Sequence, residues 1–205
     1  MRWSCILALA AGSLVAADGP TLFYSKSFPG STPAYVEITL SKSGDVAYRE
    51  APDDDNPVKF QLKETETQEI FGLVEKAGSF KRQLEAPVKV AFMGAKTFRL
   101  GNGADKSEVK FNYTQDAAAQ ALADWFERMA ETATRRLDLE RTAKYDKLGV
   151  VQSLLELEIL LDKKRLLGAE QFLPLLDRIA NNESYMHTGR SRAAEIASAI
   201  RNAKP

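Results

Sequence analysis

The sequence predicts an α+β protein, in which an antiparallel sheet with one packed helix is followed by an all-helical C-terminal half of about four helices. From Thr21 to Tyr113 the apolar residues tend to alternate, which is the period of a strand with one buried face. Beyond Thr114 they recur at helical spacing instead. Short connections between the predicted strands favour antiparallel pairing.

A β-hairpin is predicted over residues 34–49. Apolar side chains alternate from Ala34 to Leu40, the stretch Lys42-Ser43-Gly44-Asp45 supplies a turn, and Val46 begins the partner strand. The same alternation predicts about four strands before the first helix and two or three after it. The later candidates are residues 58–62, 88–92, 98–100 and 109–113, with Gly101-Asn102-Gly103 in the loop between the last two.

The first helix is predicted over residues 65–76, where apolar residues change to helical spacing. Thr65 or Thr67 is a candidate N-cap, and Gly78 closes the C-terminal end.

Four further helices are predicted in the C-terminal half. Asp116 caps the first, whose apolar stripe comprises Leu122, Trp125, Phe126, Met129, Ala133 and Leu137. The others cover about residues 146–164, 169–181 and 190–202, with a break at Gly168 and with Pro174 tolerated in a first turn. Their lengths suggest two antiparallel pairs.

The chain divides into a signal peptide (1–17), an antiparallel α+β region (18–113) and a helical region (114–205). No proline-rich or glycine-rich linker separates the last two regions. We therefore expect the long helix to start on the sheet and extend beyond it, within one composite unit.

The signal peptide is predicted from Arg2, an apolar run from Ile6 to Val15, and the small residues Val15-Ala16-Ala17 at the cleavage position. This run is too short to cross a bilayer. We expect an exported protein, periplasmic or extracellular, without a transmembrane segment in the mature chain.

Cys5 is the only cysteine and lies within the predicted signal peptide. The mature chain then has no disulfide, thiol nucleophile or thiolate metal ligand. The full chain has 28 basic and 28 acidic side chains. A nearly neutral chain is unsuited to binding nucleic acid.

Residues 28–50 contain Gly30, Pro33, Tyr35, Ile38, Gly44, Val46 and Tyr48. In these positions the segment resembles the opening hairpin of an exported bacterial domain family of unknown function. The resemblance implies an antiparallel sheet with a packed helix and no particular activity. The family commonly has cysteines flanking the glycine, where this chain carries Pro29 and Thr32. In physical terms, Gly30 and Pro33 describe a rigid turn that enters a strand.

No catalytic constellation is recognisable, so catalytic residues remain unassigned and no cofactor or metal site is predicted. His187 is the sole histidine, and the HExxH and GxSxG motifs are absent. The acidic loop Asp53-Asp54-Asp55-Asn56 lacks the EF-hand spacing and is interpreted as solvated. Gly101-Asn102-Gly103 lacks the third glycine of a dinucleotide fingerprint. The mixed charges of residues 135–147 indicate a solvated helix face.

The sequence therefore favours a non-enzymatic, exported binding or structural module of the cell envelope, with a protein as its possible partner. The expected binding surfaces are an exposed sheet face and the groove between helix pairs. The alternative is a glycosidase-like hydrolase with two unidentified carboxylates, and a third possibility is a helical scaffold capped by the sheet. A concave pocket with two carboxylates about 5 to 10 Å apart would favour the enzyme, and a flat apolar patch the binder.

Overall fold

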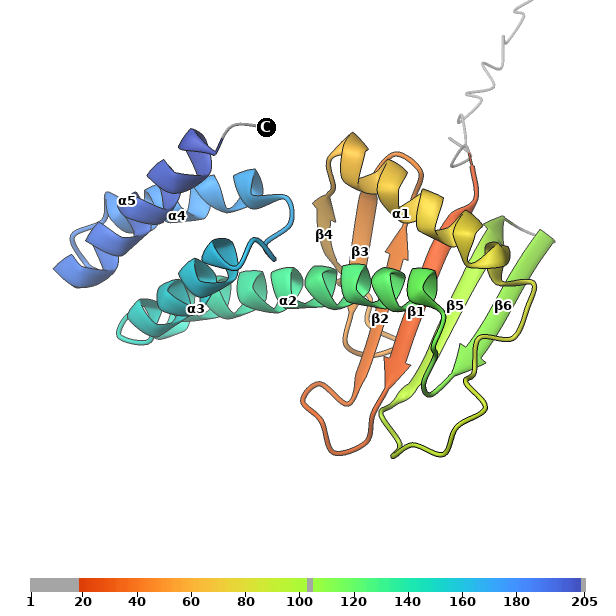
Figure 1. Ribbon diagram of the computed structural model, residues 1–205. Helices are drawn as coiled ribbons and strands as arrows, with labels where there is room; N and C mark the ends of the chain where they lie inside the picture. The colour runs from red at the N-terminus through yellow and green to blue at the C-terminus, as the bar shows by residue number, and fades with distance from the viewer. Residues whose placement is uncertain (1–18, 103–104, 204–205) are drawn as a thin grey trace, which may run out of the picture.

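A six-stranded antiparallel sheet is covered on one face by two helices, and a helical extension projects from its side (Figure 1). The computed structural model describes residues 19–102 and 105–203. The strand order is β4-β3-β2-β1-β5-β6. The predicted α+β class is confirmed. The predicted signal peptide (1–17), including Cys5, and Gly103 of the predicted turn lie outside the described residues.

The strands are β1 (Thr21–Ser27), β2 (Tyr35–Leu40), β3 (Asp45–Arg49), β4 (Val58–Gln61), β5 (Ala95–Asn102) and β6 (Asp105–Phe111). The helices are α1 (Glu64–Lys76), α2 (Ala117–Tyr145), α3 (Val150–Asp162), α4 (Leu173–Ala180) and α5 (His187–Asn202). Two short 3-10 turns, η1 (Gly78–Phe80) and η2 (Ala169–Phe172), connect them.

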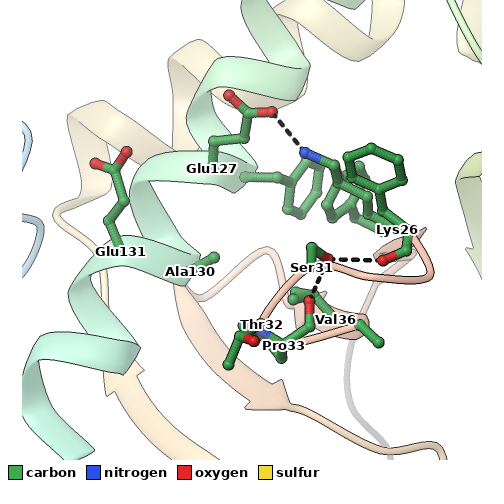
Figure 2. Close-up of a pocket in the computed structure, with 12 residues that line it drawn as sticks. Lys26, Ser31, Thr32, Pro33, Val36, Glu127, Ala130 and Glu131 are labelled. Carbon is green, nitrogen blue, oxygen red and sulfur yellow. Dashed lines mark hydrogen bonds and ion pairs between the residues drawn. The ribbon is translucent and has the colours of Figure 1, made fainter. Parts of the chain in front are cut away.

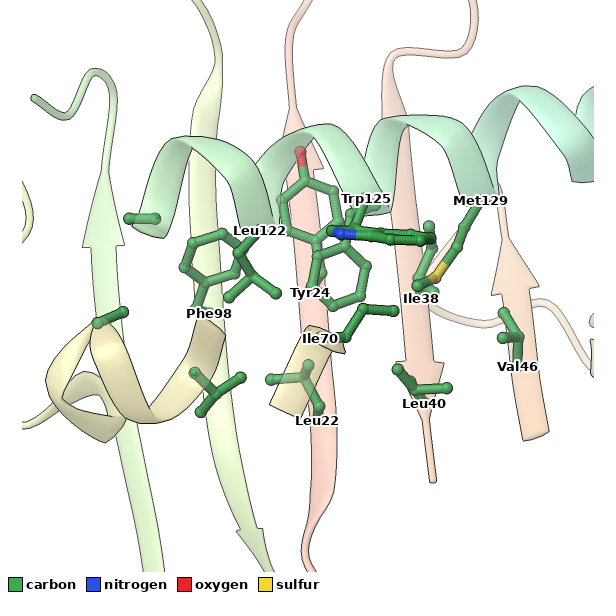
Figure 3. Packing of buried hydrophobic residues seen from close by; sticks show 14 of the residues in the cluster. Leu22, Tyr24, Ile38, Leu40, Val46, Ile70, Phe98, Leu122, Trp125 and Met129 are labelled. Carbon is green, nitrogen blue, oxygen red and sulfur yellow. The ribbon is translucent and has the colours of Figure 1, made fainter. Parts of the chain in front are cut away.

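The predicted hairpin is confirmed as β2 and β3, which pair with Leu40 opposite Val46. Gly44 closes its turn with a φ of 90°, a left-handed conformation that favours glycine. Alternate strand residues face the helices and form the sheet core. Figure 3 shows part of this core: Leu22, Tyr24, Ile38, Leu40, Val46 and Phe98 on the strands, with Ile70, Leu122, Trp125 and Met129 on the helices.

The prediction of a strand at residues 88–92 is wrong, because this segment has a bend at Val88 and no regular secondary structure from residue 89 to residue 94. After η1 the chain runs to the end of β6 before β5 begins at Ala95. The backbone N–H of Ala86 donates to Tyr113 O, and the Asn112 side chain binds the backbone of Ala91 and Met93. These contacts hold the segment at the end of β6 instead of beside it.

Helix α1 begins one residue earlier than predicted, and the predicted N-caps are wrong. Both Thr65 and Thr67 lie inside the helix, and the Thr67 hydroxyl donates to Lys63 O. The carboxylate of Glu66 accepts the backbone N–H of Lys63 at 2.9 Å and serves the N-terminus instead. Gly78 follows the last turn with a φ of 75°, as predicted for the C-terminal end.

Helix α2 begins at the predicted N-cap, since Asp116 Oδ1 accepts the N–H of Ala119 at 2.9 Å. Its 29 residues span about 44 Å. The first half packs on the sheet through residues such as Phe126, and the second half packs in a separate helical core through Leu139 and Ala143. Leu137, predicted in the buried stripe, is exposed because the contacts of α2 change sides where it leaves the sheet.

The remaining helices match the prediction in number but differ in their ends. Helix α3 begins at Val150 and not near residue 146 as predicted, and Leu148, which precedes it, is exposed. Gly168 separates α3 from η2 with a φ of 54°, and Pro174 lies in the first turn of α4 as predicted. Within the described part of the chain, no helix has both the length and the apolar character needed to span a bilayer.

Candidate functional site

A pocket of about 340 Å³ lies between the end of β1, the loop at residues 28–34, and α2 (Figure 2). The loop forms one wall and α2 the other. Ala130 points from α2 toward the loop, so no large side chain fills the space between them. The lining is largely apolar, with Phe28, Pro33, Val36, Phe126 and Ala130 among its residues.

Tyr24 lines the pocket, and its buried phenol lacks a hydrogen-bond partner among the residues that the structure describes. Tyr24 stacks on Phe126, with 4.6 Å between ring centroids, and its side chain is almost fully buried. Within the described residues, nothing accepts a hydrogen bond from its hydroxyl. Burial, and then the charge of Glu127, raise the pKa of Tyr24. The hydroxyl therefore stays protonated and is a donor without an acceptor.

The loop wall is held by its own hydrogen bonds. The Ser31 hydroxyl lies 2.7 Å from the carbonyl oxygens of both Phe28 and Pro33, and Phe28 N–H donates to Ala34 O. Gly30 has a φ of 89°, and the Thr32–Pro33 peptide is cis. The turn predicted from Gly30 and Pro33 is confirmed, because β2 begins at Tyr35.

Both carboxylates of the pocket lining, Glu127 and Glu131, are paired with cations. The Lys26 ammonium lies 3.4 Å from Glu127, and the Arg165 guanidinium lies 2.7 Å from Glu131 and 2.9 Å from Asp124. The hydrogen bonds that Arg165 donates to Glu131 and Asp124 raise the pKa of Arg165. The site thus carries no strong net charge to attract an ionic ligand.

Glu127 and Glu131 are the two carboxylates of the pocket lining. They lie one turn apart on α2, which separates their Cβ atoms by roughly 5–6 Å. A concave pocket lined by two carboxylates is what the glycosidase alternative expects, although the Cβ spacing is not the separation of the carboxyl groups. Figure 2 shows, however, that both side chains extend from the same helix, and each is paired with a cation. Glycoside cleavage needs carboxyl groups that flank the scissile bond.

The chemically suggestive residues of the sequence do not line this pocket. His187 is exposed at the first residue of α5, whereas we expected it in the connection before that helix. Asp53 and Asp55 are exposed in the β3–β4 loop, and the Asp54 carboxylate accepts the N–H of Asn56. Among the residues that the structure describes, no cluster of three or more His, Cys, Asp or Glu side chains could hold a metal ion.

Both surfaces expected from the sequence exist in the fold. On the sheet face away from the helices, Glu37 accepts hydrogen bonds from Tyr35 and Arg49, and Arg99 lies over the ring of Phe23. A groove of about 750 Å³ lies between α2 and α4, lined by Arg136, Glu140, Ala143, Lys144, Gln171, Pro174, Leu175 and Arg178. As far as the described residues extend, neither surface is lined by a buried side-chain donor without a partner, in contrast to the Tyr24 pocket.

No protein-family model and no curated protein matches the chain. The function is therefore argued from the geometry of the pocket.

Proposed function

We propose that the protein is a non-enzymatic, exported binding module of the cell envelope, and that it binds an apolar side chain of a partner protein in the Tyr24 pocket. One observation carries this proposal: the Tyr24 hydroxyl is a buried donor without an acceptor among the described residues, and Tyr24 lines an open, mostly apolar pocket. A ligand that brings an acceptor oxygen would remove the free-energy cost of this unpaired group.

The ligand chemistry follows from the lining. Phe126, Val36 and Ala130 offer apolar contact, while Lys26 and Glu127 already neutralise one another. A neutral group with an apolar body and a carbonyl oxygen is therefore the best match. A hydrophobic residue of a partner protein has this chemistry if its side chain inserts into the pocket and its backbone carbonyl lies near Tyr24.

Binding is favoured over hydrolysis because the two pocket carboxylates share one helix wall. A general acid must give up a proton to the leaving group, but Glu127 and Glu131 are each held against a cation. Hydrolysis of nitrophenyl glycosides that is lost in both Glu127→Gln and Glu131→Gln would support the enzyme instead.

Titration with N-acetylphenylalaninamide tests the pocket, because this probe is neutral and carries both a ring and carbonyl groups. We expect NMR chemical-shift changes at Val36 and Ala130 and no binding to Ala130→Phe, whose ring would fill the pocket. Ala199→Phe is the matched control, since Ala199 is exposed on α5. Equal binding to both variants would contradict the assignment.

Export is tested separately by N-terminal sequencing of the protein recovered outside the cytoplasm. The proposal expects a start near Asp18. A protein that retains Met1 would contradict the cleavable signal peptide and, with it, the envelope location.

A further inference from the structure

An exposed apolar patch lies beside the pocket, on two loops at the end of the sheet away from α1 (Figure 1). Phe28 comes from the β1–β2 loop, and the others come from the segment that precedes β5. The rings of Phe28 and Phe92 meet edge to face with 5.9 Å between centroids, which joins the two loops. The patch comprises Phe28, Val88, Val90, Phe92 and Met93.

These side chains are large and apolar, and yet they are exposed to solvent. Phe92 is 56% exposed and Met93 is 50% exposed. The backbone beneath them is anchored, since the Asn112 side chain accepts from Met93 N–H and donates to Ala91 O. The fold thus holds apolar groups in water at defined positions, which is typical of an interaction surface.

The charged residues of the two loops are all basic. Residues 27–34 and 86–96 contain no aspartate or glutamate, and Lys89 lies in the middle of the apolar segment. Lys96 borders the patch, with its ammonium near the carbonyl oxygens of Met93 and Asn112. Basic residues among exposed apolar side chains complement an anionic lipid surface.

The carboxylates near the patch form hydrogen bonds or ion pairs with other groups. Glu85 accepts the backbone N–H of Asn112, and Glu127 pairs with Lys26. The acidic residues 53–55 occupy the β3–β4 loop, and Figure 1 shows the two apolar loops reaching beyond that loop. An approaching surface would therefore meet apolar side chains and lysines first.

We propose that this patch docks the protein on an anionic lipid bilayer, with Phe28, Val90 and Phe92 inserted at the level of the headgroups. The loops protrude, which suits a fluid surface better than a rigid protein groove. The two loops form neither helix nor strand, and irregular backbone is not stable in the hydrocarbon core, so insertion stops at the headgroups. This interaction goes beyond the proposed pocket ligand and does not rest on it.

Co-sedimentation with vesicles tests the proposal. We expect the full protein to bind vesicles of equal parts phosphatidylglycerol and phosphatidylcholine. Phe92→Ser removes most of one inserted side chain and should weaken partitioning about tenfold. Leu148→Ser is the matched control, because Leu148 is 73% exposed in the helical half, and it should bind like the unmodified protein.

The charge contribution is tested by Lys89→Glu. We expect several-fold weaker binding to the phosphatidylglycerol vesicles and no change on phosphatidylcholine alone. Absence of binding at low salt would overturn the proposal, as would equal binding by Phe92→Ser and the unmodified protein. Analytical ultracentrifugation tests whether the patch binds a second copy of the chain instead of a bilayer. A dimer that Phe92→Ser dissociates, together with no vesicle binding, would overturn the proposal and assign the patch to self-association.

Discussion

Tyr24 stacks on Phe126 with 4.6 Å between ring centroids and 12° between ring planes. This contact joins the central strand β1 to the sheet-covering half of α2, and both rings also lie against Phe98. Tyr24 and Phe126, which both line the pocket, are therefore also part of the sheet core. A ligand that binds there contacts the residues that hold the helix on the sheet, so pocket chemistry and stability are linked.

Removal of the Tyr24 hydroxyl tests whether it is unpaired. Without ligand, Tyr24→Phe should stabilise the protein by about 1 kcal/mol, because the variant no longer buries an unsatisfied donor. Urea unfolding measures the change. A loss of stability of similar size would mean that the hydroxyl has a partner in the free protein.

Stability should fall at alkaline pH. Burial is the main cause that raises the pKa of both Tyr24 and Tyr48 above their ordinary value of 10.0. The folded protein then keeps phenol protons that the unfolded chain loses, so this stability is complete below about pH 10 and is lost as the pH rises above it.

Urea unfolding between pH 8 and pH 11 measures this effect. Each buried phenol should contribute about 1.4 kcal/mol per pH unit above pH 10. Tyr24→Phe should reduce the slope, whereas Tyr145→Phe, at an exposed position, should not. An identical slope in the two variants would contradict the assignment to Tyr24.

Gly44 and Gly72 should respond in opposite directions to alanine. At Gly44, φ is 90° and a Cβ atom would lie 2.9 Å from Leu62 O, so Gly44→Ala should cost about 1–3 kcal/mol. Gly72 lies within α1, where an added Cβ atom would meet nothing within 4 Å, and Gly72→Ala should add about 0.5–1 kcal/mol. Thermal unfolding compares the two, and a tolerated Gly44→Ala would contradict the turn.

Asp116 should contribute chiefly as the N-cap of α2. Asp116→Ala removes the hydrogen bond to Ala119 N–H and should cost about 1 kcal/mol. Asp116→Asn keeps the cap but loses the ion pair with Arg82, and it should be nearly neutral. If Asn were as costly as Ala in denaturant unfolding, the ion pair would be the larger contribution.

The sequence predicts elements well where local pattern and tertiary partner agree. The β2–β3 hairpin has both alternation and a glycine turn, and α2 has both an apolar stripe and Asp116. The same alternation at Val88 and Val90 predicts a strand, but hydrogen bonds to Asn112 and Tyr113 hold this segment at the end of β6. Alternation shows which side chains are apolar, but it does not show whether the segment pairs with another strand.

The pocket could not be predicted from local patterns, because its walls are distant in the chain. Lys26 and Glu127 meet across 101 residues, and the recess depends on Ala130 facing the 28–34 loop. Ala130 lies outside the apolar stripe predicted for this helix, so the sequence pattern does not single it out. The expected sheet face and helix groove followed from the fold class alone.

The most direct test of the proposed binding function compares acetophenone with ethylbenzene, which lacks the carbonyl, against the unmodified protein and Tyr24→Phe. NMR titration gives the four dissociation constants. The Tyr24 pocket predicts that acetophenone binds about tenfold more tightly than ethylbenzene to the unmodified protein and that Tyr24→Phe removes this difference. The same preference for acetophenone in both proteins, or no binding of either compound at the pocket, would contradict it.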